Sequence, residues 1–158
     1  MIRKSIIPFI LLVSLWLAGC EEFANMQKEN AIFDVAEHQD MTKSEFAKRY
    51  KDYKFRCTKE KDYDFCSFET PNCDVSATFR GQRLLDLYIT HISKDIPLNS
   101  RGIYNFNLPV YPVNDKKSNH FTISYEGNVP GWKNVYIQSN NLKNKRLDTA
   151  WFGKESYN

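Results

Sequence analysis

The pattern of the chain changes at residues 53–68, which have the sequence YKFRCTKEKDYDFCSF. Tyr53, Phe55 and Cys57 alternate with charged or polar residues, and a second alternating run, residues 63–68, follows a polar turn. A period of two is typical of a strand with one buried face. This stretch therefore predicts two antiparallel strands joined by a tight turn.

A turn at Lys61-Asp62 sets the register of this hairpin and places Cys57 opposite Cys66. The same register forms one aromatic pair and two pairs of opposite charge, namely Phe55 with Phe68, Lys54 with Glu69 and Lys59 with Asp64. Cross-strand pairs of these kinds stabilise antiparallel strands. In a hairpin with a two-residue turn, the two cysteines also occupy a non-hydrogen-bonded pair, where side chains approach most closely. The one feature against this register is that Lys-Asp is not a favoured sequence for such a turn.

A second hairpin is predicted at residues 74–92, with its turn near Gly81. Three further strands are expected, at residues 104–113, 120–126 and 133–138. A turn is expected at residues 127–131, between the last two of these strands. Pro109 and Pro112 restrict the first of these strands to the edge of a sheet, or to an extended arm. Residues after Asn140 show no clear pattern.

Two local signals place helices before the strands. Residues 31–37 carry enough apolar side chains for one face of a short helix. Thr42 and Glu45 form a capping-box sequence, which predicts a helix from Lys43 to about Tyr50. The expected fold class is α+β, with one or two short N-terminal helices followed by a mainly antiparallel β meander or sheet.

The first twenty residues have the features of an export signal. Arg3 and Lys4 precede an apolar run, residues 6–17, which is too short for a hydrocarbon core that needs about 20 apolar residues. The run ends in Leu17-Ala18-Gly19-Cys20, which closely resembles the lipobox of bacterial lipoprotein precursors. The resemblance implies cleavage of the Gly19–Cys20 bond, diacylglycerol on the cysteine sulfur and an acyl chain such as palmitate on the new amine. An uncleaved signal anchor, or a secretory signal with a chance cysteine, is the alternative.

Removal of residues 1–19 leaves 139 residues, which suits a single domain. We interpret residues 20–30 as a polar tether and residues 31–158 as one α+β domain on the periplasmic side of a membrane. In lipoproteins of enteric bacteria, an aspartate after the lipidated cysteine favours retention in the inner membrane. Glu21 occupies this position here, which favours the outer membrane, with the periplasmic face of the inner membrane as the alternative.

The charge balance excludes one class of partner. Loss of Arg3 and Lys4 with the signal lowers the formal net charge from +3 to +1. No stripe of lysine or arginine remains, so nucleic acid is not an expected partner. The expected partners are the membrane, through acylated Cys20, and an envelope protein.

Cys57, Cys66 and Cys73 remain if Cys20 is lipidated. In an oxidising periplasm two of them should pair and leave one thiol. Cys57–Cys66 is the favoured disulfide, with Cys66–Cys73 and Cys57–Cys73 as alternatives. Cys73 is in phase with the apolar arm of the second hairpin, which predicts a buried structural thiol. No histidine lies within this cysteine cluster, so we expect no metal site and no cofactor.

No arrangement of residues predicts a catalytic site. His38, His91 and His120 lie far apart in the sequence and are interpreted as ordinary surface or packing residues, and no catalytic motif is present. Nothing in the sequence brings Cys73 and His120 together as a nucleophile pair. Aromatic residues make up 15% of the chain, and most should fill the core. Trp132, on the rim of a predicted turn, is the first candidate for contact with a partner.

A capped helix begins Met41-Thr42-Lys43-Ser44-Glu45, and the antiparallel meander that follows ends Phe79-Arg80-Gly81-Gln82-Arg83-Leu84. This combination is similar to the small α+β lipoproteins of outer-membrane protein assembly, the SmpA/OmlA type, and to β-lactamase-inhibitor proteins of the same topology. The likeness covers residues 30–92. The chain departs from it after the helix, where Lys51-Asp52-Tyr53-Lys54 stand in place of glycine and proline. No functional residue is carried over from this resemblance.

These observations favour a non-catalytic function. The expected role is that of a lipid-anchored module that binds another envelope protein through a strand edge or an aromatic patch. An inhibitor or immunity protein that neutralises a toxin or enzyme is the alternative within the binding class. An envelope hydrolase is the alternative from another class, and it lacks a recognisable nucleophile, metal site or carboxylate pair.

The variant Cys20→Ser removes the sulfur that would carry the diacylglycerol. Acyl chains contribute about 0.8 kcal/mol per buried methylene, so a lipidated cysteine holds a protein firmly on a membrane. We expect the variant to move from the membrane fraction to the soluble periplasmic fraction, as measured by cell fractionation and immunoblotting. A variant that stays with the membrane would show that lipidation is not the anchor.

Overall fold

A computed structural model describes residues 30–99, 101–108, 122–125, 129–140, 143 and 145–155. The predicted signal, the cleavage position Gly19, the lipidation position Cys20 and the tether up to residue 29 lie outside the described residues, and so does His120. Among the described residues, no helix has the length and apolar character that crossing a membrane requires.

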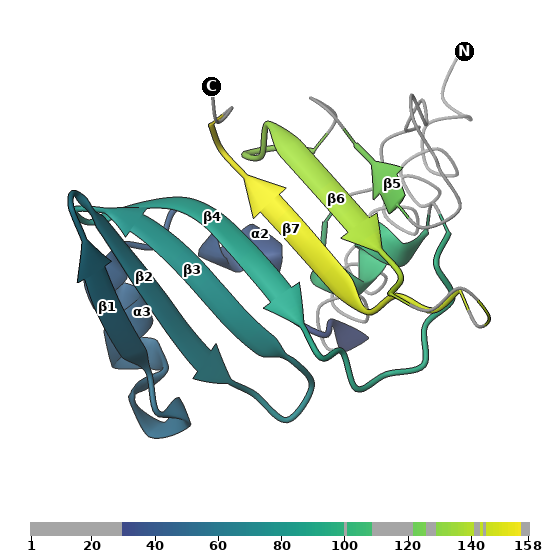
Figure 1. Ribbon diagram of the computed structural model, residues 1–158, viewed down its shortest axis with the longest axis horizontal. Helices are drawn as coiled ribbons and strands as arrows, with labels where there is room; N and C mark the ends of the chain where they lie inside the picture. Colours follow the sequence, from purple (N-terminus) through teal and green to yellow (C-terminus); the bar gives the residue numbers. More distant parts are fainter. Residues whose placement is uncertain are drawn as a thin grey trace, which may run out of the picture.

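The described strands form one antiparallel sheet of seven strands in the order β1-β2-β3-β4-β7-β6-β5 (Figure 1). Their bounds are Arg56–Glu60 for β1, Tyr63–Glu69 for β2, Asp74–Arg80 for β3, Arg83–Thr90 for β4, Thr122–Ser124 for β5, Asn134–Gln138 for β6 and Thr149–Gly153 for β7. The helices described are α2 (Val35–His38), α3 (Lys43–Arg49) and the 3₁₀ helices η1 (Lys51–Tyr53) and η2 (Gly102–Phe106). This part of the chain is mostly β, and the predicted order of short helices followed by antiparallel strands is confirmed.

Side-chain caps determine where the two α-helices begin. Thr42 Oγ1 accepts a hydrogen bond from the Glu45 amide at 3.2 Å, and Glu45 Oε2 accepts one from the Thr42 amide at 2.7 Å. These bonds complete the predicted capping box of α3 and satisfy amides that a helix start leaves without partners. α2 starts later than the predicted Ala31, because Asp34 caps it by accepting a bond from the Glu37 amide at 2.9 Å.

β1 and β2 pair in the predicted register, with Cys57 opposite Cys66 and the turn between Glu60 and Tyr63. Lys61 in the turn has a φ of 54°, in the left-handed region, which suits the twist of a tight antiparallel turn. The Cys57–Cys66 disulfide is present, so the favoured pairing of the cysteines is confirmed.

The strands after β2 follow the prediction in part. β3 and β4 form the second hairpin around Gly81, whose φ is 62°. β5 and β6 fall within the strands predicted at residues 120–126 and 133–138. β7 lies between β4 and β6 and pairs with both, although the sequence after Asn140 showed no strand pattern.

The strand expected at residues 104–113 is wrong in its first part. Residues Gly102–Phe106 form η2, and residues 109–113 lie outside the described chain. Ile103 and Phe106 are 1% and 0% exposed. A strand would turn these two side chains to opposite faces, whereas one turn of 3₁₀ helix points both into the core.

The core lies on one side of the sheet, the side on which Figure 1 shows α2 and α3. Phe46 of α3 packs against Phe79 on β3, with their ring centroids 5.4 Å apart. Phe106 of η2 packs against Phe152 on β7, with their ring centroids 5.2 Å apart. The alternate side chains of the strands, such as exposed Ser76, point to the opposite side, here called the uncovered face.

Burial in the core favours the neutral form of one histidine. His38 ends α2 and is 2% exposed. Its Nδ1 lies 2.5 Å from the carbonyl oxygen of Asp34 and therefore donates, so Nε2 accepts a bond from the Tyr50 hydroxyl, also at 2.5 Å. Burial lowers the pKa of His38, and burial raises the pKa of Tyr50.

We expect acid to destabilise the fold through His38. The unfolded chain takes up a proton as the pH falls below 6.5, the ordinary pKa of histidine, whereas buried His38 resists protonation. The free energy of unfolding should therefore fall with pH in this range, and His38→Gln should flatten that dependence. Urea unfolding at a series of pH values measures it. His91→Gln, at a side chain that is 82% exposed, is the control; an unchanged slope in His38→Gln would assign the dependence to other groups.

Candidate interaction surface

Three aromatic side chains lie next to one another on the uncovered face. Tyr88 of β4 is opposite Trp151 of β7, and Trp151 is opposite Tyr136 of β6. The rings of Tyr136 and Trp151 are stacked, with centroids 5.3 Å apart and planes inclined by 23°. Tyr88 is 39% exposed. We call these three side chains the aromatic row, and it is the largest cluster of aromatic side chains that the register places on this face.

The position of Trp151 depends on a residue that has no side chain. A Cβ atom on Gly153 would lie 2.6 Å from Trp151 Cζ2 and 2.7 Å from Cη2, closer than van der Waals contact permits. The indole therefore lies along β7, over the backbone of Gly153. Glycine within a strand commonly marks such a close approach, and here it lets the indole lie flat on the sheet.

Polar groups surround the aromatic row. Ser76 is opposite Tyr88 on the next strand, and Ser124 is opposite Tyr136 on the other side. A depression of about 620 Å³ adjoins Tyr88 where β4 ends and β7 begins. Arg146 and Asp148 line it and form an ion pair at 3.2 Å. Apolar contact area with hydrogen-bonding groups at its rim is a composition that protein–protein interfaces commonly have.

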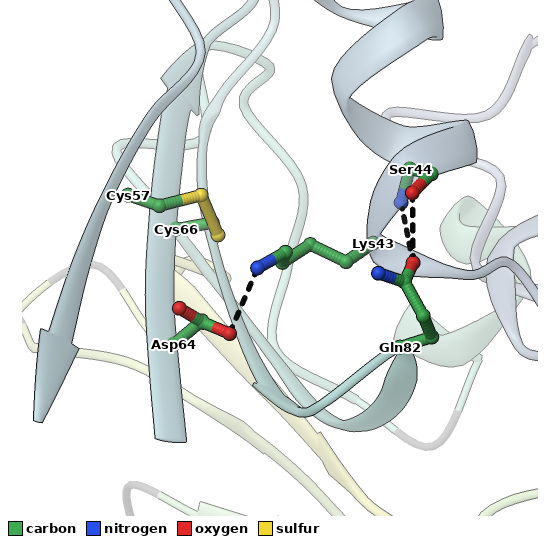
Figure 2. Close-up of a disulfide and its surroundings, with 6 residues drawn as sticks. All are labelled: Lys43, Ser44, Cys57, Asp64, Cys66 and Gln82. Carbon is green, nitrogen blue, oxygen red and sulfur yellow. Dashed lines mark hydrogen bonds and ion pairs between the residues drawn. A yellow bond between two sulfur atoms is a disulfide. The ribbon is translucent and has the colours of Figure 1, made fainter. Parts of the chain in front are cut away.

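The disulfide joins the edge strand β1 to β2, and contacts with α3 hold this hairpin (Figure 2). Lys43 Nζ forms an ion pair with Asp64 Oδ2 of β2 at 2.9 Å. Ser44 donates from its amide and hydroxyl to Gln82 Oε1 in the turn between β3 and β4, at 3.0 and 2.9 Å. The start of α3 is thereby fixed to both hairpins.

The third cysteine of the described residues is a buried thiol, as predicted. Cys73 is free and 2% exposed, and its sulfur lies 3.5 Å from the Thr70 hydroxyl. Burial raises the pKa of the Cys73 thiol, which suppresses the thiolate that a nucleophile needs. The structure therefore favours a packing role for Cys73.

Trp132 is buried rather than exposed. It is 3% exposed, its ring lies 5.7 Å from that of Phe152, and the Lys154 ammonium group lies 5.5 Å from its ring centre. The chain turns back at Gly131, whose φ is 78°, and this turn directs the indole inward. The contact surface expected at Trp132 is thus corrected: its indole belongs to the core and is not available to a partner.

The members of the aromatic row were not singled out from the sequence, although a signal for them exists. Tyr136 is out of phase with the buried residues Val135 and Ile137, and Tyr88 is out of phase with Leu87 and Ile89. This alternation places both tyrosines on the side away from the core. Their proximity was not visible, because it depends on the position of β7 between β4 and β6.

The histidines do not form a site with the cysteines in the described residues. His38 is in the core, and His91 at the end of β4 is paired with Asp74 at 2.6 Å. The described part of the chain contains no cluster of three or more metal-ligating side chains. Comparison of the chain with protein families, with characterised proteins and with solved structures finds no match.

We expect Gly153→Ala to displace the Trp151 indole from the sheet without unfolding the protein. The new methyl group meets the outer end of the ring, which is able to swing toward solvent, so stability should change by less than about 1 kcal/mol. Nuclear magnetic resonance of the indole and of the Tyr136 ring measures the loss of their contact.

The control for this prediction is Gly81→Ala. No atom lies within 4 Å of a Cβ at Gly81, but its φ of 62° is unfavourable for alanine. This variant should lose about 1 kcal/mol of stability and leave the Trp151 signals unchanged. Unchanged Trp151 signals in Gly153→Ala would show that the indole does not lie on Gly153.

Proposed function

We propose that the protein is a lipid-anchored lipoprotein of the cell envelope, located on the periplasmic side of the outer membrane. Its role is non-catalytic: it binds another envelope protein. The contact is made by the uncovered face, and the observation that carries this assignment is the aromatic row of Tyr88, Trp151 and Tyr136 across three neighbouring strands.

Two independent features support export and anchoring. The sequence Leu17-Ala18-Gly19-Cys20 resembles a lipobox and supplies the attachment point. The Cys57–Cys66 disulfide is of the kind that persists in oxidising compartments and is rare in the cytosol. Lipidation at Cys20 and oxidation of the hairpin are therefore expected in the same place, outside the inner membrane.

The composition of the uncovered face supports protein binding. Tyrosine and tryptophan bury a large area at low cost in side-chain entropy, and they are enriched among residues that dominate binding energy. The stacked pair Tyr136–Trp151 is already ordered, which reduces the entropy lost on binding. Exposed Tyr88 extends this ordered pair toward the depression beside β4.

Capture of the partner from its native membrane tests this function. The lipidated protein is purified from gently solubilised envelopes, and co-purifying proteins are identified by mass spectrometry. Tyr88→Ser should reduce the recovery of the partner at least tenfold, which corresponds to about 1.4 kcal/mol of binding energy. The matched control is Tyr53→Ser, because Tyr53 is 41% exposed and Tyr88 is 39% exposed.

Equal loss of the partner in Tyr88→Ser and Tyr53→Ser, or no loss in either, would contradict a contact at the aromatic row. The identity of the partner distinguishes the two binding roles. An assembly component of the envelope agrees with the proposal. A toxin or enzyme that is inactive in the complex would establish the inhibitor or immunity role instead.

A further inference from the structure

β1 is an edge of the sheet with nothing from the described chain beside it. It pairs with β2 only, at the end of the strand order, and all five of its residues are exposed. Figure 1 shows β1 at the extreme side of the sheet, away from β7 and β6. Such an edge presents unpaired backbone amides and carbonyls, which are able to form a ladder with a further strand.

The register identifies which backbone groups are unpaired. In an antiparallel hairpin, the residues flanking a two-residue turn form a hydrogen-bonded pair, and the pairs then alternate along the ladder. Glu60–Tyr63 flanks the turn, so Cys57–Cys66 is a non-hydrogen-bonded pair. Its Cα–Cα distance of 4.0 Å agrees with this, since such pairs are the closer of the two kinds. The amides and carbonyls of Cys57 and Lys59 therefore point outward, away from β2.

The sequence of β1, RCTKE, is complementary in charge to itself when two copies run antiparallel around Thr58. In that arrangement Arg56 faces Glu60 of a second copy, and Glu60 faces the second copy's Arg56. Both side chains lie on the uncovered face, and neither forms an ion pair with another described residue. Thr58 of one copy lies opposite Thr58 of the other, midway between the two Arg56–Glu60 pairs.

The backbone agrees with the same register. Cys57 faces Lys59 of the second copy, and both residues carry the outward-pointing amides and carbonyls. The hydrogen bonds of the ladder and the opposite charges are thus satisfied together. A shift of one residue would bring an outward-pointing residue opposite an inward-pointing one. A shift of two residues would place Lys59 opposite Lys59 or Cys57 opposite Cys57 and would lose both Arg56–Glu60 pairs.

We propose that a second copy of this chain docks on β1, so that the two sheets join into one continuous sheet across a two-fold axis at Thr58. Each Cys57 amide donates to the carbonyl of the partner's Lys59, each Lys59 amide donates to the carbonyl of the partner's Cys57, and Arg56 pairs with the partner's Glu60. Opposite charges directly across a strand pair stabilise the pairing of the two strands. This is an isologous contact, in which the same patch serves both subunits.

The disulfide has a direct role in this contact. Cys57 lies on the docking strand, and its bond to Cys66 on β2 holds the edge strand in the register that the second copy needs. The β1 contact needs neither the lipid anchor nor the aromatic row, so it stands or fails separately from the proposed function.

Charge reversal provides the first test. Sedimentation equilibrium of the purified full-length protein, in density-matched detergent if the anchor is present, should show a monomer–dimer equilibrium. Arg56→Glu and Glu60→Arg each place like charges opposite one another and should raise the dimer dissociation constant at least tenfold. The double variant Arg56→Glu with Glu60→Arg restores opposite charges and should restore the dimer. A monomeric wild-type protein, dimers that tolerate both single variants, or a double variant that stays monomeric would overturn the proposal.

A backbone test does not depend on charge. Proline at Lys59 removes an amide that points away from β2, so Lys59→Pro should abolish the dimer while the β1–β2 ladder remains. Amide hydrogen exchange of the wild-type protein then locates the contact. Protection at Cys57 and Lys59 should increase with protein concentration, whereas protection at Thr58, whose amide points to β2, should not. A dimer without this change at Cys57 and Lys59 would place the contact elsewhere and contradict docking on β1.

Discussion

Phe46 of α3 packs on Phe79 of β3, and Phe106 of η2 packs on Phe152 of β7, so the core is built against a single side of the sheet. This one-sided burial determines the direction of every other side chain in the strands, because successive residues point to opposite faces. The uncovered face and the aromatic row on it are consequences of that packing. If Tyr88, Trp151 or Tyr136 belonged to the core, a register shift would be required along the entire strand.

The contacts made by α3 connect the packed core to the strands at the edge of the sheet. The capping box fixes the start of the helix, and from this point Lys43 binds β2 while Ser44 binds the turn between β3 and β4. The disulfide then connects β2 to β1. Each step is a hydrogen bond, an ion pair or a covalent bond that connects to the ordered core, and for this reason a strand with five exposed residues keeps a defined register. A partner that docks at this edge meets a template that is already formed.

The sequence predicted the features that depend on neighbours close in the chain. Both hairpins and α3 were predicted because their registers and ends follow from short-range pairs, such as Cys57 with Cys66 and Thr42 with Glu45. β7 was not predicted, since Trp151 and Phe152 are adjacent aromatic residues that face opposite sides and hide the alternation. Trp132 was predicted to lie at the surface because it adjoins a turn in the sequence. Its burial depends on how that turn packs against the core, which the sequence does not reveal. The tyrosines of the aromatic row had an outward direction that alternation reveals, but their proximity depends on β7.

The position of β7 has a consequence for how this protein is made. Strands β1 to β4 are consecutive neighbours, so each is able to pair with the strand before it as soon as it is synthesised. β5 and β6 have no place on that sheet until residues 149–153 arrive and join them to β4. Pairing between strands that are distant in the sequence is slow, because the entropy of the long loop between them is lost before the stabilising contacts form. Until that pairing forms, the edge of β4 is open, and an open edge is where a sheet can pair with strands of other chains.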